Sequence, residues 1–346
     1  MGVLYYMKLN LKLDNNNDTY WSPIKCYSYN CFLNQITGGR GIGKTTGLLI
    51  QALRNCNKDE QFIYLRRYKP ELKEFVDKKS LDKICDDIIY KGGENGYTFL
   101  YTDTILGYGI ALTTALKYKS ADFSKVTMII YDESILDRGS TYHYLKNEVV
   151  AFLEFVSTIV RTRTNVKVFI LGNNADIFNP YNAYFNVPIY DSIYTRGKAL
   201  YCELAKNSPK LLELEKKTGL YELIKGTAYG DYHYENKVLV TNNYEISSKP
   251  SAARILCRAV INGTTLNFYT YNDAKRELNI FVEFVGKVIE GDITFYLFDS
   301  GKVNYEYFGR FRNRYRAVFT RLRCNHRMKF DSDKAGEVYK ILVDRA

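Results

Sequence analysis

Eight consecutive residues have the types and spacing of a phosphate-binding loop, Gly38-Gly39-Arg40-Gly41-Ile42-Gly43-Lys44-Thr45. Glycines allow successive backbone N–H groups to turn towards a β-phosphate, and the G-x-x-x-x-G-K-[ST] pattern brings a lysine to the β and γ oxygens. The Thr45 hydroxyl can ligate Mg²⁺. These eight residues and the adjacent Thr46 are predicted to bind a nucleotide and its magnesium ion.

The segments on both sides of this loop suit the same chemistry. An apolar run over residues 31–36 precedes it and predicts a buried strand, and a helix is predicted over residues 45–54. A helix that opens at Gly43 would direct the positive end of its dipole at the phosphate. The motif therefore lies between a strand and a helix, as nucleotide binding requires.

Two adjacent carboxylates end a second apolar run. Asp132 and Glu133 follow the run over residues 126–131. In an open α/β sheet, ligands bind at the carboxyl ends of the strands, so both side chains are expected to face the phosphate loop. Asp132 would hold Mg²⁺ through water, and Glu133 would polarise the water that attacks the γ-phosphorus.

Three polar residues flank the last predicted strand of this sheet, residues 166–171. Asn173 follows it and could hydrogen-bond the attacking water or the γ-phosphate, whereas the alternative is an Asn-rich turn. Arg161 and Arg163 precede it, at a position that is often a subunit edge. There an arginine can reach a neighbour's γ-phosphate, and the alternative is a solvated basic turn.

Residues 1–205 alternate between predicted strands and helices. Their strands are short, continuous apolar runs, typical of a parallel sheet buried on both faces. The strands are predicted at 31–36, 61–66, 126–131 and 166–171, and the main helices at 45–54 and 146–160. The pattern indicates an α/β fold, a P-loop NTPase domain with a mostly parallel sheet and right-handed crossovers.

The rest of the chain differs in kind. Residues 206–228 are polar and are interpreted as a helical linker, and residues 229–346 as a smaller α+β domain with an antiparallel sheet followed by helices. Asn262-Gly263 is a strong hairpin signal. The strands of this domain are predicted at 237–240, 254–260, 265–271, 278–285 and 294–298.

The C-terminal stretch is dense in arginine. A helix with so many cations repels itself unless a polyanion is near, so a nucleic-acid-binding surface is predicted, and a solvated basic face is the alternative. The net charge of +11 favours a polyanionic partner as well. The arginines are Arg310, Arg312, Arg314, Arg316, Arg321, Arg323 and Arg327.

The composition argues against several other classes. Seven cysteines form no C-x-x-C pair, which favours reduced thiols over disulfides or zinc, and three histidines make a histidine-rich metal site improbable. No apolar run approaches the 18 residues of a membrane span. We expect a soluble, intracellular protein without a membrane partner.

Several segments resemble a known family. The block Ile63-Tyr64-Leu65-Arg66-Arg67-Tyr68-Lys69-Pro70-Glu71-Leu72 is similar to the DNA-packaging ATPases, or encapsidation proteins, of small podophages with protein-primed genomes. Lys119-Ser120 ahead of Asp132 and the segment Gly226-Thr227-Ala228-Tyr229-Gly230 are similar to that family too. The resemblance spans nearly the whole chain, in order.

The resemblance implies a terminase-like ATPase of the additional-strand, catalytic-glutamate class that uses ATP and Mg²⁺. Such proteins form rings, usually pentamers, on the portal vertex of an empty capsid in the host cytoplasm and drive double-stranded DNA inward. Some relatives also need a packaging RNA. The family supplies one arginine in trans, here Arg161 or, with a slight preference, Arg163, and a lysine equivalent to Lys119 is proposed to act at the subunit interface.

The resemblance also implies a second domain like a ribonuclease H-type nuclease that has lost its metal site. A two-metal nuclease needs three or four converging carboxylates. Asp299 ends a predicted strand, but Glu277, Glu283 and Asp292 lie on turns or alternate strand positions without a recognisable pattern. The second domain is therefore interpreted as a nucleic-acid-binding module that is inactive as a nuclease.

The leading prediction is an ATP-driven translocase of double-stranded DNA. A GTPase switch is a competing class, but Asn57-Lys58-Asp59-Glu60 misses the N-K-x-D motif by one residue and comes too early. A nucleoside or nucleotide kinase is another competing class. Glu133 and the basic second domain argue against it, because a kinase needs only to position phosphates. A nucleotide-dependent nucleic-acid-binding protein without translocase activity is the remaining alternative.

Overall fold

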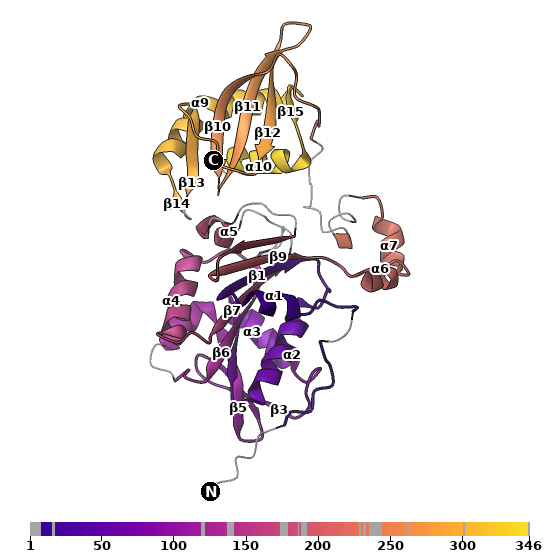
Figure 1. Ribbon diagram of the computed structural model, residues 1–346, viewed down its shortest axis with the longest axis vertical. Coiled ribbons are helices and arrows are strands. Elements are labelled where there is room, and N and C mark those ends of the chain that lie inside the picture. Colours follow the sequence, from indigo (N-terminus) through magenta and orange to yellow (C-terminus); the bar gives the residue numbers. More distant parts are fainter. Residues whose placement is uncertain are drawn as a thin grey trace. The chain divides into compact units, whose positions relative to one another are not determined.

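The structure, a computed structural model, describes most of the chain. The described residues are 8–15, 18–118, 122–136, 142–173, 179–185, 187, 192–227, 230, 233–234, 244–261, 263–299 and 302–344. The chain divides into two compact units, Met1–Asp176 with Asp191–Lys237 and Ile177–Tyr190 with Val238–Ala346 (Figure 1). This division differs from the predicted boundaries, because residues 206–228 lie within the first unit and residues 177–190 within the second.

A nine-stranded sheet forms the centre of the first unit, in the order β3-β4-β5-β2-β6-β7-β1-β9-β8. Neighbours from β5 to β9 pair in parallel, and hairpins make both edges antiparallel. This confirms the predicted mostly parallel sheet. The strands are β1 (Leu33–Gly38), β2 (Gln61–Arg66), β3 (Ile88–Gly92), β4 (Gly96–Tyr101), β5 (Thr104–Ala111), β6 (Val126–Ile135), β7 (Lys167–Asn173), β8 (Ile193–Arg196) and β9 (Leu200–Ala205).

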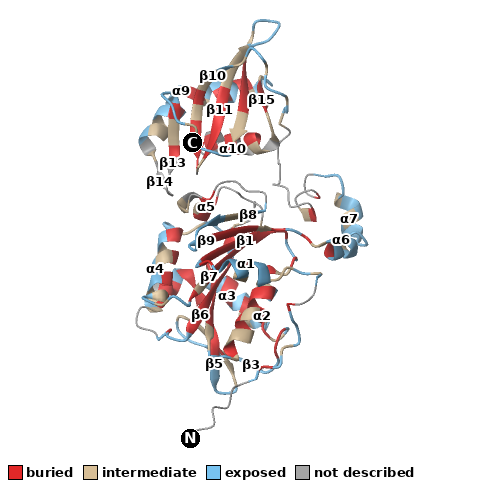
Figure 2. Cartoon of the chain, viewed as in Figure 1, coloured by how far each residue is buried: buried red, intermediate tan, exposed pale blue. Residues whose placement is uncertain are grey.

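The central strands are buried because their side chains are apolar on both faces. Every residue of β1 is buried, and Glu133 is the one exposed residue of β6 (Figure 2). Three predicted strands continue further than their apolar runs, since the backbone ladder extends into polar residues: Gly38 of β1 still pairs with Asn173 of β7. These extra residues bring the ends of the strands to the site described below.

Helices cover the faces of this sheet. Helix α2 begins directly after the phosphate loop and buries Leu48, Leu49 and Leu53, whereas α4 follows β6 and buries Phe152 and Phe155. The helices of the unit are α1 (Ile24–Tyr29), α2 (Lys44–Cys56), α3 (Lys69–Asp77), the 3₁₀ helix η1 (Leu112–Tyr118), α4 (Glu148–Val160), α6 (Pro209–Glu215) and α7 (Gly219–Ile224). The last two are the short helices predicted in the linker segment.

Strand β7 lies between β1 and β6 in the sheet. The strand that leads into the phosphate loop and the strand that carries Asp132 and Glu133 are therefore separated by one additional strand. All three run parallel, so their carboxyl ends meet at the same edge. This order is the arrangement that the additional-strand class requires.

The sequence interpretation missed five strands in the outer parts of the sheet, β3, β4, β5, β8 and β9, of which β3 and β8 are the edge strands. Strand β5 contains two glycines, and β3 and β4 are partly exposed, so they lack a continuous apolar run. Their pairing partners in neighbouring hairpins, more than local periodicity, make them strands.

The second unit contains a six-stranded sheet in the order β14-β13-β10-β11-β12-β15. The prediction of an antiparallel sheet is corrected here, because β13 pairs in parallel with β10 and β15 in parallel with β12. Phe268 of the sheet stacks on Phe319 of α9 in the core. The elements are α5 (Pro180–Tyr184), β10 (Arg254–Ile261), β11 (Thr264–Asn272), β12 (Leu278–Val285), β13 (Thr294–Asp299), β14 (Lys302–Val303), α9 (Tyr305–Cys324), β15 (Met328–Phe330) and α10 (Asp333–Asp344).

Some predictions fall outside the described residues, namely the strand at 237–240 and Asn262 of the hairpin. Within the described ranges, no helix is long and apolar enough to cross a bilayer. All seven cysteines are free thiols, and Cys324 is the exposed one.

Candidate active site

The phosphate loop turns sharply between β1 and α2. Gly41 and Gly43 have φ angles of +76° and +94°, which L side chains rarely adopt. Gly43 is also the N-cap of α2, and a Cβ atom there would lie 2.9 Å from Cβ of Tyr20. Glycine is therefore required at this position for both its backbone conformation and its lack of volume.

Lys44 is buried and folded back onto its own loop. Its ammonium group donates to the carbonyl oxygens of Gly38 at 3.0 Å and Gly39 at 2.7 Å. These acceptors hold the lysine next to the cradle of loop N–H groups. A phosphate in that cradle would offer the ammonium group a charged partner.

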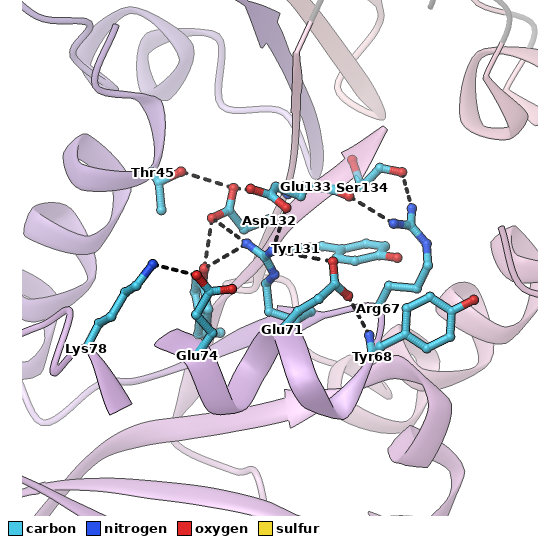
Figure 3. Close-up of polar contacts among 12 residues, drawn as sticks. Thr45, Arg67, Tyr68, Glu71, Glu74, Lys78, Tyr131, Asp132, Glu133 and Ser134 are labelled. Atoms are coloured by element: carbon cyan, nitrogen blue, oxygen red, sulfur yellow. Dashed lines mark hydrogen bonds and ion pairs between the residues drawn. The ribbon is translucent and has the colours of Figure 1, made fainter. Parts of the chain in front are cut away.

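Asp132 reaches the first turn of α2. The Thr45 hydroxyl donates to one Asp132 carboxylate oxygen at 3.0 Å, and the Tyr64 hydroxyl donates to the other at 2.8 Å (Figure 3). Burial raises the pKa of Tyr64 well above its usual range, so its hydroxyl stays protonated and acts as a donor. A hydroxyl and a carboxylate form the hard oxygen donor set that suits Mg²⁺. Thr45 and Asp132 therefore fit a magnesium ion.

Glu133 has an unusual backbone and an unexpected partner. Its φ is +51°, in the left-handed region that a glutamate seldom occupies. Its carboxylate accepts from the Arg66 guanidinium at 2.5 Å, and 60% of its side-chain surface is accessible (Figure 3). Desolvation by the surrounding protein raises the pKa of Glu133, and the nearby Arg66 opposes that shift. The Glu133 carboxylate thus has a raised pKa and forms an ion pair with the Arg66 guanidinium.

Arg66 lies among three carboxylates at the end of β2. Besides Glu133, it contacts Asp132 and Glu71, both at 3.4 Å. Sequence reasoning did not assign Arg66 a role, although an arginine as the last residue of a buried strand was a usable signal. Arg66 offsets part of the negative charge of these three carboxylates.

Arg67 holds the backbone beside Glu133. Its guanidinium donates to the carbonyl oxygens of Glu133 at 3.1 Å and Ser134 at 2.6 Å (Figure 3). It also forms a fully buried ion pair with Glu148. This role was missed too, because Glu148 lies 81 residues away along the chain.

The phosphate loop, Asp132, Glu133 and the end of β7 line one pocket of about 440 Å³. Arg40 and Thr46 are at its wall, together with Gly172 and Asn173. The structure thus brings together the loop, both carboxylates and Asn173, as the sequence predicted for their positions. The pocket combines phosphate donors, a magnesium donor set and a candidate base.

A family model for the podovirus DNA encapsidation protein (Gp16) matches residues 15–285. The chain belongs to this family. Family membership agrees with the resemblance found in the sequence. The matched range includes every residue that lines the pocket.

Individual relatives of this encapsidation-family chain agree. A DNA packaging protein of Bacillus phage B103 is 31% identical over 249 residues, which are 70% of this chain and 75% of the relative. A DNA packaging protein of Bacillus phage phi29 is 29% identical over 258 residues, or 72% and 75%. A chain of the solved bacteriophage phi-29 viral genome packaging motor assembly is 22% identical, with a TM-score of 0.55 over 94% of this chain and 99% of that one. The structural match shows a shared fold.

The two arginines before β7 have different surroundings in this family member. Arg163 donates to the carbonyl oxygens of Ser124 and Val126, both at 2.7 Å, and to that of Ile159. Arg161 is exposed, and within the described residues its side chain has no hydrogen bond or salt bridge. Both precede the amino end of β7, whereas the pocket of the same chain lies at the carboxyl ends of the parallel strands. Lys119 lies outside the described residues.

Most of the predicted nucleic-acid-binding arginines lie on α9 of the second unit. Arg310 pairs with Glu306 and Arg327 with Glu277, each at 2.7 Å, and Arg323 lies over aromatic rings. Among the described residues, no salt bridge forms at the other four, Arg312, Arg314, Arg316 and Arg321. Phe311, Tyr315 and Phe319 anchor α9 in the core of the second unit.

The described carboxylates that were considered for a nuclease site do not form a metal-binding group. Glu283 accepts from Tyr269 at 2.6 Å and Asn267 at 2.9 Å, and Glu277 pairs with Arg327. Across the described ranges, no three His, Cys, Asp or Glu side chains are grouped to hold a metal ion. The side chain of Asp299 is not among those described.

Proposed function

We propose that this chain is an ATP-hydrolysing motor that translocates double-stranded viral DNA into a preformed capsid. Membership of the encapsidation family supports the packaging role. The observation that carries the ATPase proposal is the meeting of Lys44, Thr45, Asp132 and Glu133 at one pocket. The reaction would convert ATP and water to ADP and phosphate.

Different residues of the pocket would bind the phosphates, hold Mg²⁺ and accept a proton. The loop N–H groups and Lys44 would bind the β and γ phosphates, and Thr45 and Asp132 would hold Mg²⁺, which when bound neutralises phosphate charge. Glu133 would accept a proton from the attacking water. Asn173, at the wall of the pocket, would orient that water or the γ-phosphate.

Glu133 must leave Arg66 before it can act as a base. The ion pair directs the carboxylate at a guanidinium and lowers its basicity. Arg66 has other acceptors in Asp132 and Glu71, so it can release Glu133 and stay paired. We infer that the structure represents a resting state and that release of Glu133 accompanies hydrolysis.

We further propose a ring, a pentamer by family resemblance, on the portal vertex of the capsid in the host cytoplasm. Arg161 would complete the neighbour's site, because it is exposed, whereas Arg163 is occupied with three backbone carbonyls. This choice differs from the slight preference for Arg163 that the family resemblance implied. Lys119 stays a proposed interface residue, and a packaging RNA an additional proposed partner.

The second unit would bind duplex DNA through α9. Arg312, Arg314 and Arg321 are exposed and lack acidic partners in the described part of the chain, so phosphates could serve as their counter-ions. Such contacts to the DNA backbone read no sequence, which suits a protein that must move along a genome.

The decisive experiment is ATP turnover by the purified full chain with and without linear duplex DNA. A translocase should be stimulated by duplex, and Lys44→Ala should be inactive in both conditions while still folded, because the Lys44 ammonium group donates to carbonyl oxygens of its own loop. A nucleotide switch would instead turn over slowly and independently of duplex. Retained hydrolysis by soluble Lys44→Ala would remove the basis of the proposal.

A further inference from the structure

Helix α4 is attached to strand β6 at the end near the active site. Arg67 donates to both carboxylate oxygens of Glu148, the first residue of α4, at 2.8 and 3.0 Å. The same guanidinium donates to the backbone carbonyls of Glu133 and Ser134 in β6 (Figure 3). One side chain therefore joins the start of α4 to the backbone of the candidate base.

This junction is buried and held by several directed contacts. The Arg67 and Glu148 side chains are 0% and 1% exposed. The guanidinium lies over the rings of Tyr131 and Tyr144, and the Tyr131 hydroxyl donates to Glu148 at 3.0 Å. A buried, bidentate pair with these additional bonds cannot shift one partner without the other.

The far end of α4 is attached to the start of the same strand. Arg163 follows α4 and donates to the carbonyl oxygens of Val126, the first residue of β6, and Ser124. It also donates to that of Ile159, in the last turn of α4. Two arginines therefore fasten the two ends of the helix to the two ends of β6.

Arg161 lies within the second attachment. It is the C-cap of α4, with a φ of +49°, and its N–H donates to the Ser157 carbonyl at 3.0 Å. Its backbone position is thus set by the last turn of the helix. A 13-residue helix is about 20 Å long and moves as a rigid body, so a displacement at Glu148 reaches Arg161.

We propose that Arg67 and Glu148 are positioning residues that couple the conformation of Glu133 in one subunit to the arginine, Arg161, that it presents to the next. This inference rests on the proposed function of Arg161. When Glu133 leaves Arg66 and its left-handed backbone changes, its carbonyl moves. Arg67 transfers that movement to Glu148, and α4 carries it to Arg161.

The test uses rings mixed from two variants of the full chain. The donor, Glu133→Gln, should hydrolyse ATP more slowly, by about 10²-fold or more, but it supplies Arg161. The acceptor, Arg161→Ala, has an intact pocket but supplies no arginine. Hydrolysis in the mixture reports on donor arginines acting in acceptor sites. Arg67→Lys is then added to the donor, where the pocket is already slow and chiefly the effect on the neighbour remains.

We expect Arg67→Lys in the donor to lower the complemented rate about tenfold or more, because one ammonium group cannot replace four directed bonds and a misplaced group costs a large factor in rate. Lys125→Met in the donor, which breaks an exposed ion pair with Asp59, should leave the rate unchanged. Sedimentation and binding of a fluorescent ATP analogue establish that each donor assembles and binds nucleotide. If Arg67→Lys fails to fold, the isosteric Glu148→Gln donor replaces it, with the same expected direction.

An unchanged complemented rate with an assembled Arg67→Lys or Glu148→Gln donor overturns the coupling and leaves the trans arginine intact. A parent pair that regains no activity instead overturns the trans arginine, and the coupling with it. The two failures are distinguished by the parent mixture alone.

Discussion

At the scale of single residues, the central feature of the site is the Glu133 carboxylate, which is ion-paired with Arg66. Desolvation by the surrounding protein raises the pKa of this partly accessible carboxylate. If Glu133 is the base, as proposed, it becomes active when it leaves Arg66. Two predictions test this description.

Replacing Glu133 by Gln removes the base and keeps Thr45 and Asp132. ATP should still bind, and turnover should fall by about 10²-fold or more, since proton transfer is lost. Single-turnover hydrolysis and nucleotide binding measure the two effects separately. Glu74→Gln, at an exposed carboxylate that pairs with Lys78, is the matched control and should behave as wild type. Equal turnover by both variants would show that Glu133 is not the base.

Replacing Arg66 by Gln should change the pH dependence of hydrolysis. Glu133 must be deprotonated to act, so the rate rises with pH through its pKa, which burial raises above the ordinary value. Arg66 lowers that pKa, and its removal should therefore move the acidic limb of kcat/KM to higher pH. Lys78→Met serves as the control for loss of a nearby exposed charge. A limb at the same or lower pH would contradict the assignment.

At the scale of elements, the arginines after α4 and those on α9 differ in their bonding partners. At the C-terminal end of α4, Arg161 and Arg163 are separated by one residue, yet Arg163 donates to three backbone carbonyls, whereas Arg161 is exposed and forms no salt bridge with the described residues. On α9 some arginines are already paired with glutamates and others are not. Both contrasts provide matched pairs of variants.

Arg163→Ala should destabilise the first unit, by about 1–3 kcal/mol, because three backbone carbonyls lose a charged donor. Arg161→Ala should leave the free energy of unfolding nearly unchanged and slow hydrolysis by about 10³-fold, as loss of an arginine finger does. Urea denaturation and ATP turnover measure these quantities. Destabilisation by Arg161→Ala with normal turnover would reverse the assignment.

Substitution of Arg312, Arg314 or Arg321 by Gln should weaken duplex binding for all sequences alike. Each change should reduce the slope of log K against log salt by about 1, since one phosphate contact is lost. Arg310→Gln is the control, because Glu306 already neutralises that cation, and its slope should change less. A uniform effect of all four, or none, would exclude this face of α9 as the DNA contact.

At the scale of the whole molecule, a subunit that depends on a neighbour's arginine is incomplete alone. ATP turnover per subunit should therefore rise with protein concentration as rings assemble, and level off once assembly is complete. Arg161→Ala should assemble over the same range in sedimentation but stay slow throughout. Turnover per subunit that is constant from dilute to assembled protein would place the full reaction within one chain.

The sequence by itself determined the phosphate loop, the Asp132-Glu133 pair, the central parallel strands and the short helices after residue 206. These features are recorded in contiguous residues, as motif spacing or as an apolar run, so they can be found without a fold. It also identified the family. The antiparallel sheet predicted for the second unit was wrong, because whether β13 and β15 run parallel to their neighbours depends on which strands they pair with.

Only the tertiary structure decided what the arginines do. Arg66 and Glu133 are 67 residues apart, and Arg67 and Glu148 are 81 apart, so no local pattern links them. Arg161 and Arg163 look equivalent in the sequence, yet one bonds three backbone carbonyls and the other faces solvent. A cation's partner is chosen by which acceptors the fold brings within about 3 Å, and that is a property of the packed chain.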